Sequence, residues 1–268
     1  MRTLGWMALN GFRESVRDKV LYNLVAFAIL LMATSLVLRQ LTAGQDLKIM
    51  KDLGLSAMSL FGVFIAVFIG IGLVSKEVER RSIYNLLSKP VRRSDVVIGK
   101  YAGLVLTLTV NIAVMTVALY AILAFVASGE SEMGRQAWEA PALDPALLKA
   151  VLLILVQLMI VTAIALFFST FSTPLLSAAL TLGFYVAGYF SADLRNLNQV
   201  VASPATQWMA RALSYVLPDL GSFDVTAQVV HGLAVPAGYV ASTVVYGLLY
   251  VTLLLAAGAA VFSRRDFK

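Results

Sequence analysis

Residues 76–100 read KEVERRSIYNLLSKPVRRSDVVIGK and form a charged segment in an otherwise apolar region. An apolar run, 55–75, precedes this segment, and another, 97–127, begins within its last residues. A helix needs about 20 predominantly apolar residues to cross the hydrocarbon core of a bilayer, and each run is long enough. The stretch therefore predicts two membrane-spanning helices joined by a segment that stays in water.

The rest of the chain has the composition of a membrane protein. Hydrophobic residues make up 60% of the 268 residues, charged residues make up 13%, and the mean hydropathy is +0.85. The apolar runs are continuous and do not alternate with period two, which favours helices over a β-barrel. The expected transmembrane helices cover residues 20–38, 55–75, 97–127, 147–168, 174–190 and 238–262. We therefore expect an all-α polytopic membrane protein, with six transmembrane helices in a single domain over residues 1–268.

Two further segments are expected to lie outside the spanning helices. Residues 1–19 predict an amphipathic helix at the membrane interface, because Leu9, Phe12 and Val16 share one helical face. The alternative is a cytoplasmic extension of the first span. Residues 191–237, between the fifth and sixth spans, form an outer segment that is long and partly apolar for a plain loop.

The distribution of basic residues predicts the orientation. With the N-terminus in the cytoplasm, the N-terminal segment contributes four basic residues, residues 76–100 contribute seven, and the C-terminal tail contributes three. Fourteen of the 21 lysine and arginine residues then lie on the cytoplasmic side, as the positive-inside rule requires. The sequence pI of about 9.6 therefore indicates membrane topology and not nucleic-acid binding. Both termini are expected in the cytoplasm.

Several kinds of site are excluded by composition. The chain has no cysteine and a single histidine, His231, so it cannot form a disulfide or a Cys/His metal site. A G-x-x-x-x-G-K-[ST] phosphate loop is also absent, because Ser94 stands where Gly99-Lys100 would require the first glycine. The spans carry almost no ionisable groups, which weighs against transport driven by an ion gradient. We expect no catalytic, cofactor-binding or metal-binding residues on this chain, and an integral-membrane enzyme is the weakest interpretation.

The first half of the quoted stretch, residues 76–88, predicts a short amphipathic helix. Ile83, Leu86 and Leu87 fall on one helical face, and Pro90 follows the predicted end of the helix. The alternative is a polar loop that only keeps two spans apart. A loop in water has no need of an apolar face, whereas apolar anchors rimmed by arginine are typical of protein interfaces. The segment is therefore expected to dock a cytoplasmic partner.

Polar and small residues within the spans indicate where helices pack. Asn111 and Gln157 are the notable polar side chains, and their more common role is hydrogen bonding between helices. Lining a path through the bundle is the alternative. Gly62, Ala66 and Gly70 recur at four-residue spacing, which lets a second helix approach closely.

Three patches of sequence share the pattern of a known family. They are EVERRSIY at 77–84 with LLSKP at 86–90, LPDL at 217–220 with FD at 223–224, and FSRRDF at 262–267. Together they resemble ABC-2 type permeases. The resemblance is closest to the multi-copper enzyme maturation branch, which includes the nitrous oxide reductase maturation permease, and it runs along essentially the whole chain.

The resemblance implies an ABC-2 (type V exporter-like) fold in which two six-helix subunits, expected to be a homodimer, each bind a separate cytoplasmic ATP-binding subunit. That partner would hold ATP and Mg²⁺, and a coupling helix within residues 76–96 would receive its motion. The family also places short re-entrant helices in the outer segment. The residues expected to dock the ATPase are Glu77, Glu79, Arg80, Arg81, Tyr84, Leu86, Leu87, Pro90 and Arg93.

Two functions follow from the resemblance. The first is a permease subunit in the bacterial cytoplasmic (inner) membrane that moves a substrate with ATP hydrolysed by its partner. The alternative is a mechanotransmitting subunit that couples the ATPase to an extracytoplasmic protein without moving a cargo. Both functions would preserve every cytoplasmic feature described above.

Overall fold

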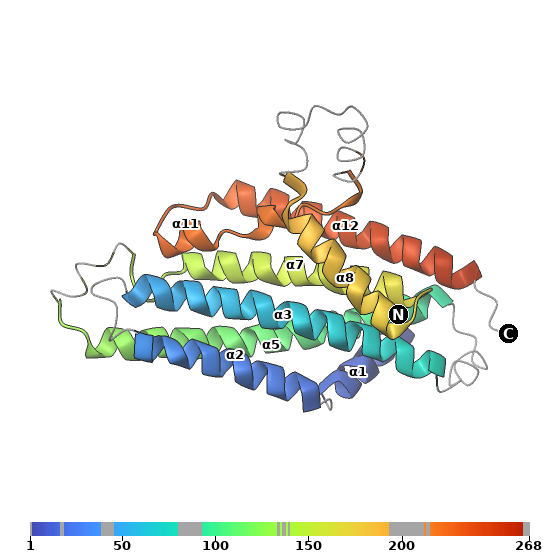
Figure 1. Cartoon of the computed structure of the whole chain (residues 1–268), viewed down its shortest axis with the longest axis horizontal. Helices are drawn as coiled ribbons and strands as arrows, with labels where there is room; N and C mark the ends of the chain where they lie inside the picture. The colour runs from blue at the N-terminus through green and yellow to red at the C-terminus, as the bar shows by residue number, and fades with distance from the viewer. Residues whose placement is uncertain are drawn as a thin grey trace.

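The computed structural model describes residues 2–16, 19–38, 46–79, 93–132, 140–192 and 215–264, together with the single residues 135, 138 and 212. All regular elements in these ranges are helices. They are α1 (Arg2–Val16), α2 (Lys19–Leu38), α3 (Asp46–Glu79), α5 (Arg93–Gly129), α7 (Ala146–Ser169), α8 (Pro174–Tyr189), η3 (Gly221–Phe223), α11 (Thr226–Val230) and α12 (Ala237–Arg264). In Figure 1 the long helices α2, α5, α3, α7 and α12 lie side by side, and α8 crosses α7 and α3 obliquely.

The expectation of an all-helical membrane protein is confirmed for the described residues. Four helices there are long and apolar enough to cross a membrane, namely Asp46–Gly72, Val97–Gly129, Ala146–Ser169 and Ala237–Val261. The apolar parts of α2 and α8 are shorter, so the count of six crossings stays a prediction. Among the four, α3 begins at Asp46, nine residues before the predicted span.

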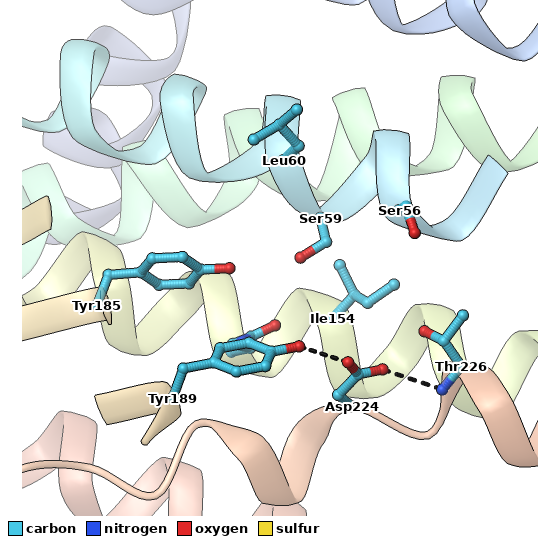
Figure 2. Close-up of a pocket in the computed structure, with 9 residues that line it drawn as sticks. Ser56, Ser59, Leu60, Ile154, Tyr185, Tyr189, Asp224 and Thr226 are labelled. Carbon is cyan, nitrogen blue, oxygen red and sulfur yellow. Dashed lines mark hydrogen bonds between the residues drawn. The ribbon is translucent and has the colours of Figure 1, made fainter. Parts of the chain in front are cut away.

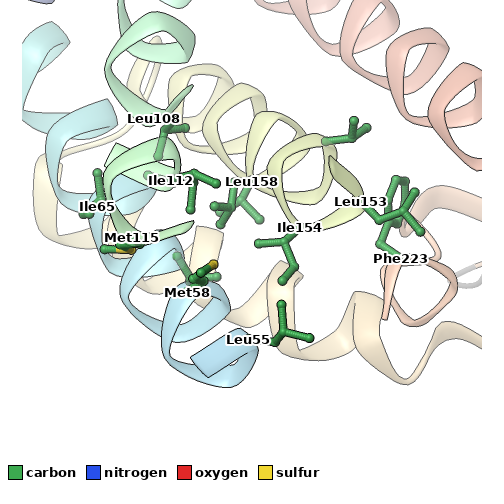
Figure 3. Packing of buried hydrophobic residues seen from close by; sticks show 14 of the residues in the cluster. Leu55, Met58, Ile65, Leu108, Ile112, Met115, Leu153, Ile154, Leu158 and Phe223 are labelled. Carbon is green, nitrogen blue, oxygen red and sulfur yellow. The ribbon is translucent and has the colours of Figure 1, made fainter. Parts of the chain in front are cut away.

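Helix α7 forms the centre of the bundle. It contacts α3, α5, α8 and α12. In its most apolar 18-residue stretch, 78% of the residues are buried inside the subunit, whereas the corresponding fraction for α12 is 17%. Its buried side chains meet Met58 of α3, Ile112 and Met115 of α5, and Phe223 beyond α8 in one continuous apolar core (Figure 3). Polar atoms on α7 therefore meet protein and not lipid.

Helix α1 packs against α5 at very close range. A methyl group added to Gly103 would lie 2.7 Å from the backbone oxygen of Ala8 and 3.1 Å from the backbone nitrogen of Phe12. The opposite side of α1 faces outward, and the Trp6 side chain is 68% exposed. Placement of α1 at a membrane interface stays a prediction.

The connection between α7 and α8 matches its sequence signals. Helix α7 ends at Ser169, and α8 begins at Pro174, which occupies its first turn. Proline suits this position because a backbone N–H in the first turn has no partner within the helix, and because the fixed φ of proline is helical. The start of α8 at Pro174 agrees with the helix expected over residues 174–190.

Hydrogen bonds to backbone oxygens clamp the end of the bundle at which α3 begins. The Lys51 ammonium, on a residue only 1% exposed, donates to the Pro141 carbonyl at 2.8 Å. Tyr120 donates to the Asp144 carbonyl at 2.9 Å, and Lys149 donates to the Val235 carbonyl at 2.7 Å. The first two bonds hold the connection between α5 and α7 against α3 and α5, and the third joins α7 to the residues before α12.

Candidate functional site

A polar cavity of about 190 Å³ lies between α3, α7, α8 and the connection from η3 to α11 (Figure 2). Its walls come from four parts of the chain that are distant in sequence. The residues that line it are Ser56, Ser59, Leu60, Ile154, Gln157, Tyr185, Tyr189, Asp224 and Thr226. Three of them, Ser56, Leu60 and Asp224, are exposed, so the cavity opens to the surface of the subunit.

The cavity lies toward the predicted outer end of the bundle. Ser59 is four residues into the predicted span 55–75, or about 6 Å of helix, and Tyr189 is the last residue of α8. Gln157 is 11 residues from the start of α7 and 12 from its end, or about 17 Å from each. A buried polar group such as Gln157 needs a partner within the protein or on a ligand.

The connection from η3 to α11 positions Asp224 at the cavity. Leu220 and Phe223 are fully buried and anchor this connection, and the Leu220 backbone N–H donates to the Gly188 carbonyl at 3.1 Å. Phe223 packs where Gly247 leaves room on α12. The side chain of Asp224, the residue after Phe223, then meets the Tyr189 hydroxyl at the cavity (Figure 2).

Two donors hold the Asp224 carboxylate. The Tyr189 hydroxyl donates to Oδ2, and the Thr226 backbone N–H donates to Oδ1 at 3.1 Å. Burial opposes ionisation of Asp224, but these hydrogen bonds outweigh it and hold the pKa of the carboxyl below its ordinary value. No lysine or arginine in the described ranges lines the cavity, so the charge on Asp224 has no cation there to balance it.

Gln157 presents an unsatisfied amide to the same cavity. The residue is 2% exposed, and its Nε2 group has no hydrogen-bond partner. A buried donor without an acceptor costs about 1–3 kcal/mol. On the opposite wall, the hydroxyls of Ser59 and Tyr185 point toward one another (Figure 2). The arrangement therefore offers one negative charge, one free amide donor and several hydroxyl groups.

The residues predicted to pack inside the bundle lie in different surroundings. Gln157 lines the cavity, whereas Asn111 donates to the Thr107 carbonyl of its own helix at 2.7 Å and is not among the lining residues. Gly62 faces the Leu158 side chain of α7, and Gly70 faces Ala165 of the same helix. Ala66, between them in sequence, is 2% exposed.

Most of the predicted docking residues lie outside the described residues. Helix α3 continues through Glu77 to Glu79, and α5 begins at Arg93, but the side chains of these three residues are not described. The remaining predicted docking residues lie outside the described residues altogether: Arg80, Arg81, Tyr84, Leu86, Leu87 and Pro90. Their role in docking an ATPase stays a prediction.

Sequence reasoning did not assign most of the cavity. Tyr185 and Tyr189 are four residues apart on α8, the spacing of one helical face, and Asp224 is the carboxylate of the FD pair quoted above. These signals were available, but no local pattern indicates that α8 and the outer segment meet beside Ser59.

Comparison with known families covers nearly the whole chain. Residues 6–267 match the family described as "ABC-2 family transporter protein". The chain belongs to the ABC-2 transporter family. No individually curated protein matches it. Membership of the multi-copper enzyme maturation branch stays a prediction.

ABC-2 family proteins are membrane components of ABC transporters. They are multi-pass proteins, they normally work with an ATP-binding subunit, and they are generally not enzymes themselves. The cavity described above thus belongs to the membrane part of a transporter-family protein.

Proposed function

We propose that this ABC-2 protein is the permease subunit of an ABC transporter, and that it moves a substrate with ATP hydrolysed by a separate cytoplasmic subunit. The family match over residues 6–267 carries this proposal, and the sequence offers no phosphate loop of its own. The proposed assembly has two copies of this chain and two ATP-binding subunits in a bacterial inner membrane. Both termini of the chain lie in the cytoplasm.

The proposed subunit crosses the membrane six times. Helix α2 has 20 residues and α8 has 16, or about 30 Å and 24 Å of helix. Added to the four longer apolar helices, they return the C-terminus to the side of the N-terminus. The distribution of basic residues supports the cytoplasm as that side.

The lengths of α3 and α5 support a coupling role for the segment between them. The two helices have 34 and 37 residues, so each is a rod of about 50–55 Å. They flank residues 80–92, and α3 also carries Ser56 and Ser59 into the cavity. Movement imposed on the coupling segment would therefore reach the cavity through a continuous helix.

Charge reversal in the coupling segment tests the proposed function. The variant combines Glu77→Lys, Arg81→Glu and Leu87→Asp. It should lose the co-purifying ATPase, because its apolar anchor and two charges are removed from the interface. A matched control on the predicted outer side combines Glu132→Lys, Arg135→Glu and Leu143→Asp and should retain the ATPase. The measurement is the ratio of ATPase to permease after affinity purification, with size-exclusion chromatography to verify the fold.

Two outcomes would oppose the proposal. A complex that survives the coupling variant intact would refute the docking assignment. ATP-dependent accumulation of solute in vesicles supports a permease, whereas a stable ATPase complex with an outer protein and no solute movement would favour the mechanotransmitting alternative.

A further inference from the structure

We propose that the cavity between α3, α7, α8 and the η3–α11 connection binds a primary ammonium group that stands next to an oxygen acceptor, on a small molecule or a headgroup. The site lies within one subunit, so this proposal goes beyond the transport function and does not depend on an ATPase partner. It rests on Asp224, on Gln157 and on the size and lining of the cavity.

The charge on Asp224 favours a cationic ligand. Each carboxylate oxygen already accepts one hydrogen bond, from Tyr189 or from the Thr226 backbone, yet a carboxylate offers about four acceptor positions. The Thr226 side chain also hydrogen-bonds this carboxylate, so at least one position remains for a ligand. An ammonium group would balance the charge that the described lining leaves uncompensated.

The unsatisfied amide of Gln157 specifies the second part of the ligand. Its Nε2 group is a donor, so a bare ammonium, which has only donors, would leave it without a partner. An oxygen close to the ammonium would accept this bond. The hydroxyls of Ser56 and Ser59 can accept the remaining ammonium hydrogens, and this complementarity favours an amino alcohol or an amino sugar over a simple alkylamine.

The size and remaining walls of the cavity fit an organic ligand. An apolar cavity of about 150 Å³ accommodates benzene, so about 190 Å³ admits a comparable group. Leu60 and Ile154 provide apolar surface for a carbon skeleton. The rings of Tyr185 and Tyr189, with centroids 5.9 Å apart, offer faces that attract cations.

A metal ion fits the cavity less well. Divalent cations such as Ca²⁺ take several oxygen ligands, usually with more than one carboxylate. The described residues contain no group of three or more His, Cys, Asp or Glu side chains that could hold a metal. Asp224 is the single carboxylate among the lining residues.

Ligand-induced stabilisation of the full-length protein tests this proposal. The purified chain is placed in nanodiscs of phosphatidylcholine and phosphatidylglycerol, which lack primary amines, and its unfolding midpoint is measured against ligand concentration. Ethanolamine and glucosamine should raise the midpoint. Their neutral counterparts, ethylene glycol and glucose, should not. Sodium chloride at the same ionic strength controls for screening and for binding of a simple cation.

Three variants assign the effect to the cavity. Asp224→Asn should weaken binding of the amines about 10- to 100-fold, the loss that removal of a charged hydrogen-bond partner produces. Tyr189→Phe should weaken it about 3- to 10-fold, because the Asp224 carboxylate loses one of the hydrogen bonds that hold it in place. Asp52→Asn changes an exposed carboxylate of α3 outside the cavity and should leave binding unchanged.

Gln157→Met distinguishes a ligand site from a structural role. Methionine replaces the unsatisfied amide with an apolar side chain of similar length, so the unliganded midpoint should stay equal or rise. Binding of the amines should nevertheless fall. If Asp224→Asn fails to fold, Gln157→Met and Tyr189→Phe still decide the question.

Several results would overturn the proposal. They are equal stabilisation by amines and neutral counterparts, equal stabilisation by sodium chloride, and amine binding that all three cavity variants retain. Nanodiscs that contain phosphatidylethanolamine identify the source of the ammonium. A higher midpoint in these discs, lost in Asp224→Asn, indicates a lipid headgroup, whereas stabilisation by the soluble amines alone indicates a free solute.

Discussion

Gly103 and Gly62 are both buried where two helices touch, but the atoms that they approach differ. A methyl group at Gly103 would lie 2.7 Å from a backbone oxygen of α1, whereas one at Gly62 would lie 2.4 Å from a terminal methyl of Leu158. A backbone atom moves only with its helix, while a leucine methyl can move by a change of rotamer. The neighbouring atom therefore decides how well each site tolerates a side chain.

Gly103→Ala is expected to lower the free energy of unfolding by about 1–3 kcal/mol, because α1 must move away from α5. Gly62→Ala should have a smaller effect. Gly183→Ala is the control, since no atom lies within 4 Å of the added methyl group, and it should leave stability unchanged or raise it by up to about 1 kcal/mol, because alanine favours a helix more than glycine does. Denaturant unfolding in mild detergent measures all three. Equal losses at Gly103 and Gly62 would contradict this explanation.

Lys51 gives a second prediction at the scale of a residue. Lys51→Met keeps the buried aliphatic chain but removes the donor to the Pro141 carbonyl. The loss should destabilise the protein by about 1–3 kcal/mol, because a partly buried acceptor is left without its partner. Asp52→Asn, at the next and exposed position, should have little effect. Thermal unfolding of both variants in the same detergent provides the comparison, and equal midpoints would argue against the clamp.

Single residues also show that hydrogen-bond partners within the bundle cannot be predicted from the sequence. Asn111 and Gln157 look alike in sequence, each a lone amide in an apolar helix. The Asn111 amide finds a carbonyl one turn away, while the Gln157 amide has no acceptor within reach. The difference lies in the neighbours that the fold brings to α7, which no local pattern contains.

At the scale of helices, the continuous apolar runs of the sequence predicted most of the long helices. The expected helix over residues 174–190 has the same start as α8. The start of α3 was missed because Lys48, Lys51 and Asp52 interrupt the apolar run. The helix continues through them because the Lys51 side chain is buried with a backbone acceptor of its own. A charge that tertiary structure satisfies is compatible with a helix that composition alone would end.

Helix α12 positions the connection that carries Asp224, and Gly247 is the point of contact. A methyl group there would lie 2.5 Å from Val156 and 3.1 Å from the Phe223 ring. Gly247→Ala should therefore displace η3, lower the unfolding midpoint by several degrees, and weaken amine binding at the cavity. Gly258→Ala on the same helix is the control, since its nearest neighbour is at 3.8 Å. Thermal unfolding with and without glucosamine measures both effects, and identical behaviour of the two variants would be inconsistent with this role.

At the scale of the whole molecule, the absence of cysteine allows topology to be mapped with single substitutions. Glu132→Cys should react with a membrane-impermeant maleimide on intact cells, because the predicted orientation places it outside. Lys89→Cys should react only after the membrane is permeabilised. Labelling of Lys89→Cys from the outside would reverse the orientation and remove the coupling segment from the cytoplasm. Blocking with the unlabelled reagent before permeabilisation is the control.

The architecture could be predicted from sequence further than the site could. Hydropathy and a family pattern depend on residues close together in the chain, and they indicated a helical ABC-2 membrane protein. The cavity combines Ser59, Gln157, Tyr189 and Asp224 from four elements, so it exists only after the helices pack. The identity of a transported substrate likewise depends on surfaces that form only when helices pack, so amino-acid composition does not indicate it.

Helix α8 is shorter than the membrane that it is proposed to cross. Its 16 residues extend about 24 Å, whereas the hydrocarbon layer is about 30 Å thick. Such hydrophobic mismatch is relieved when acyl chains beside the protein shorten or tilt. The leaflet next to α8 is therefore expected to be thinned on one flank of the subunit, which gives polar solutes a shorter distance to the level of Asp224 there than elsewhere around the protein.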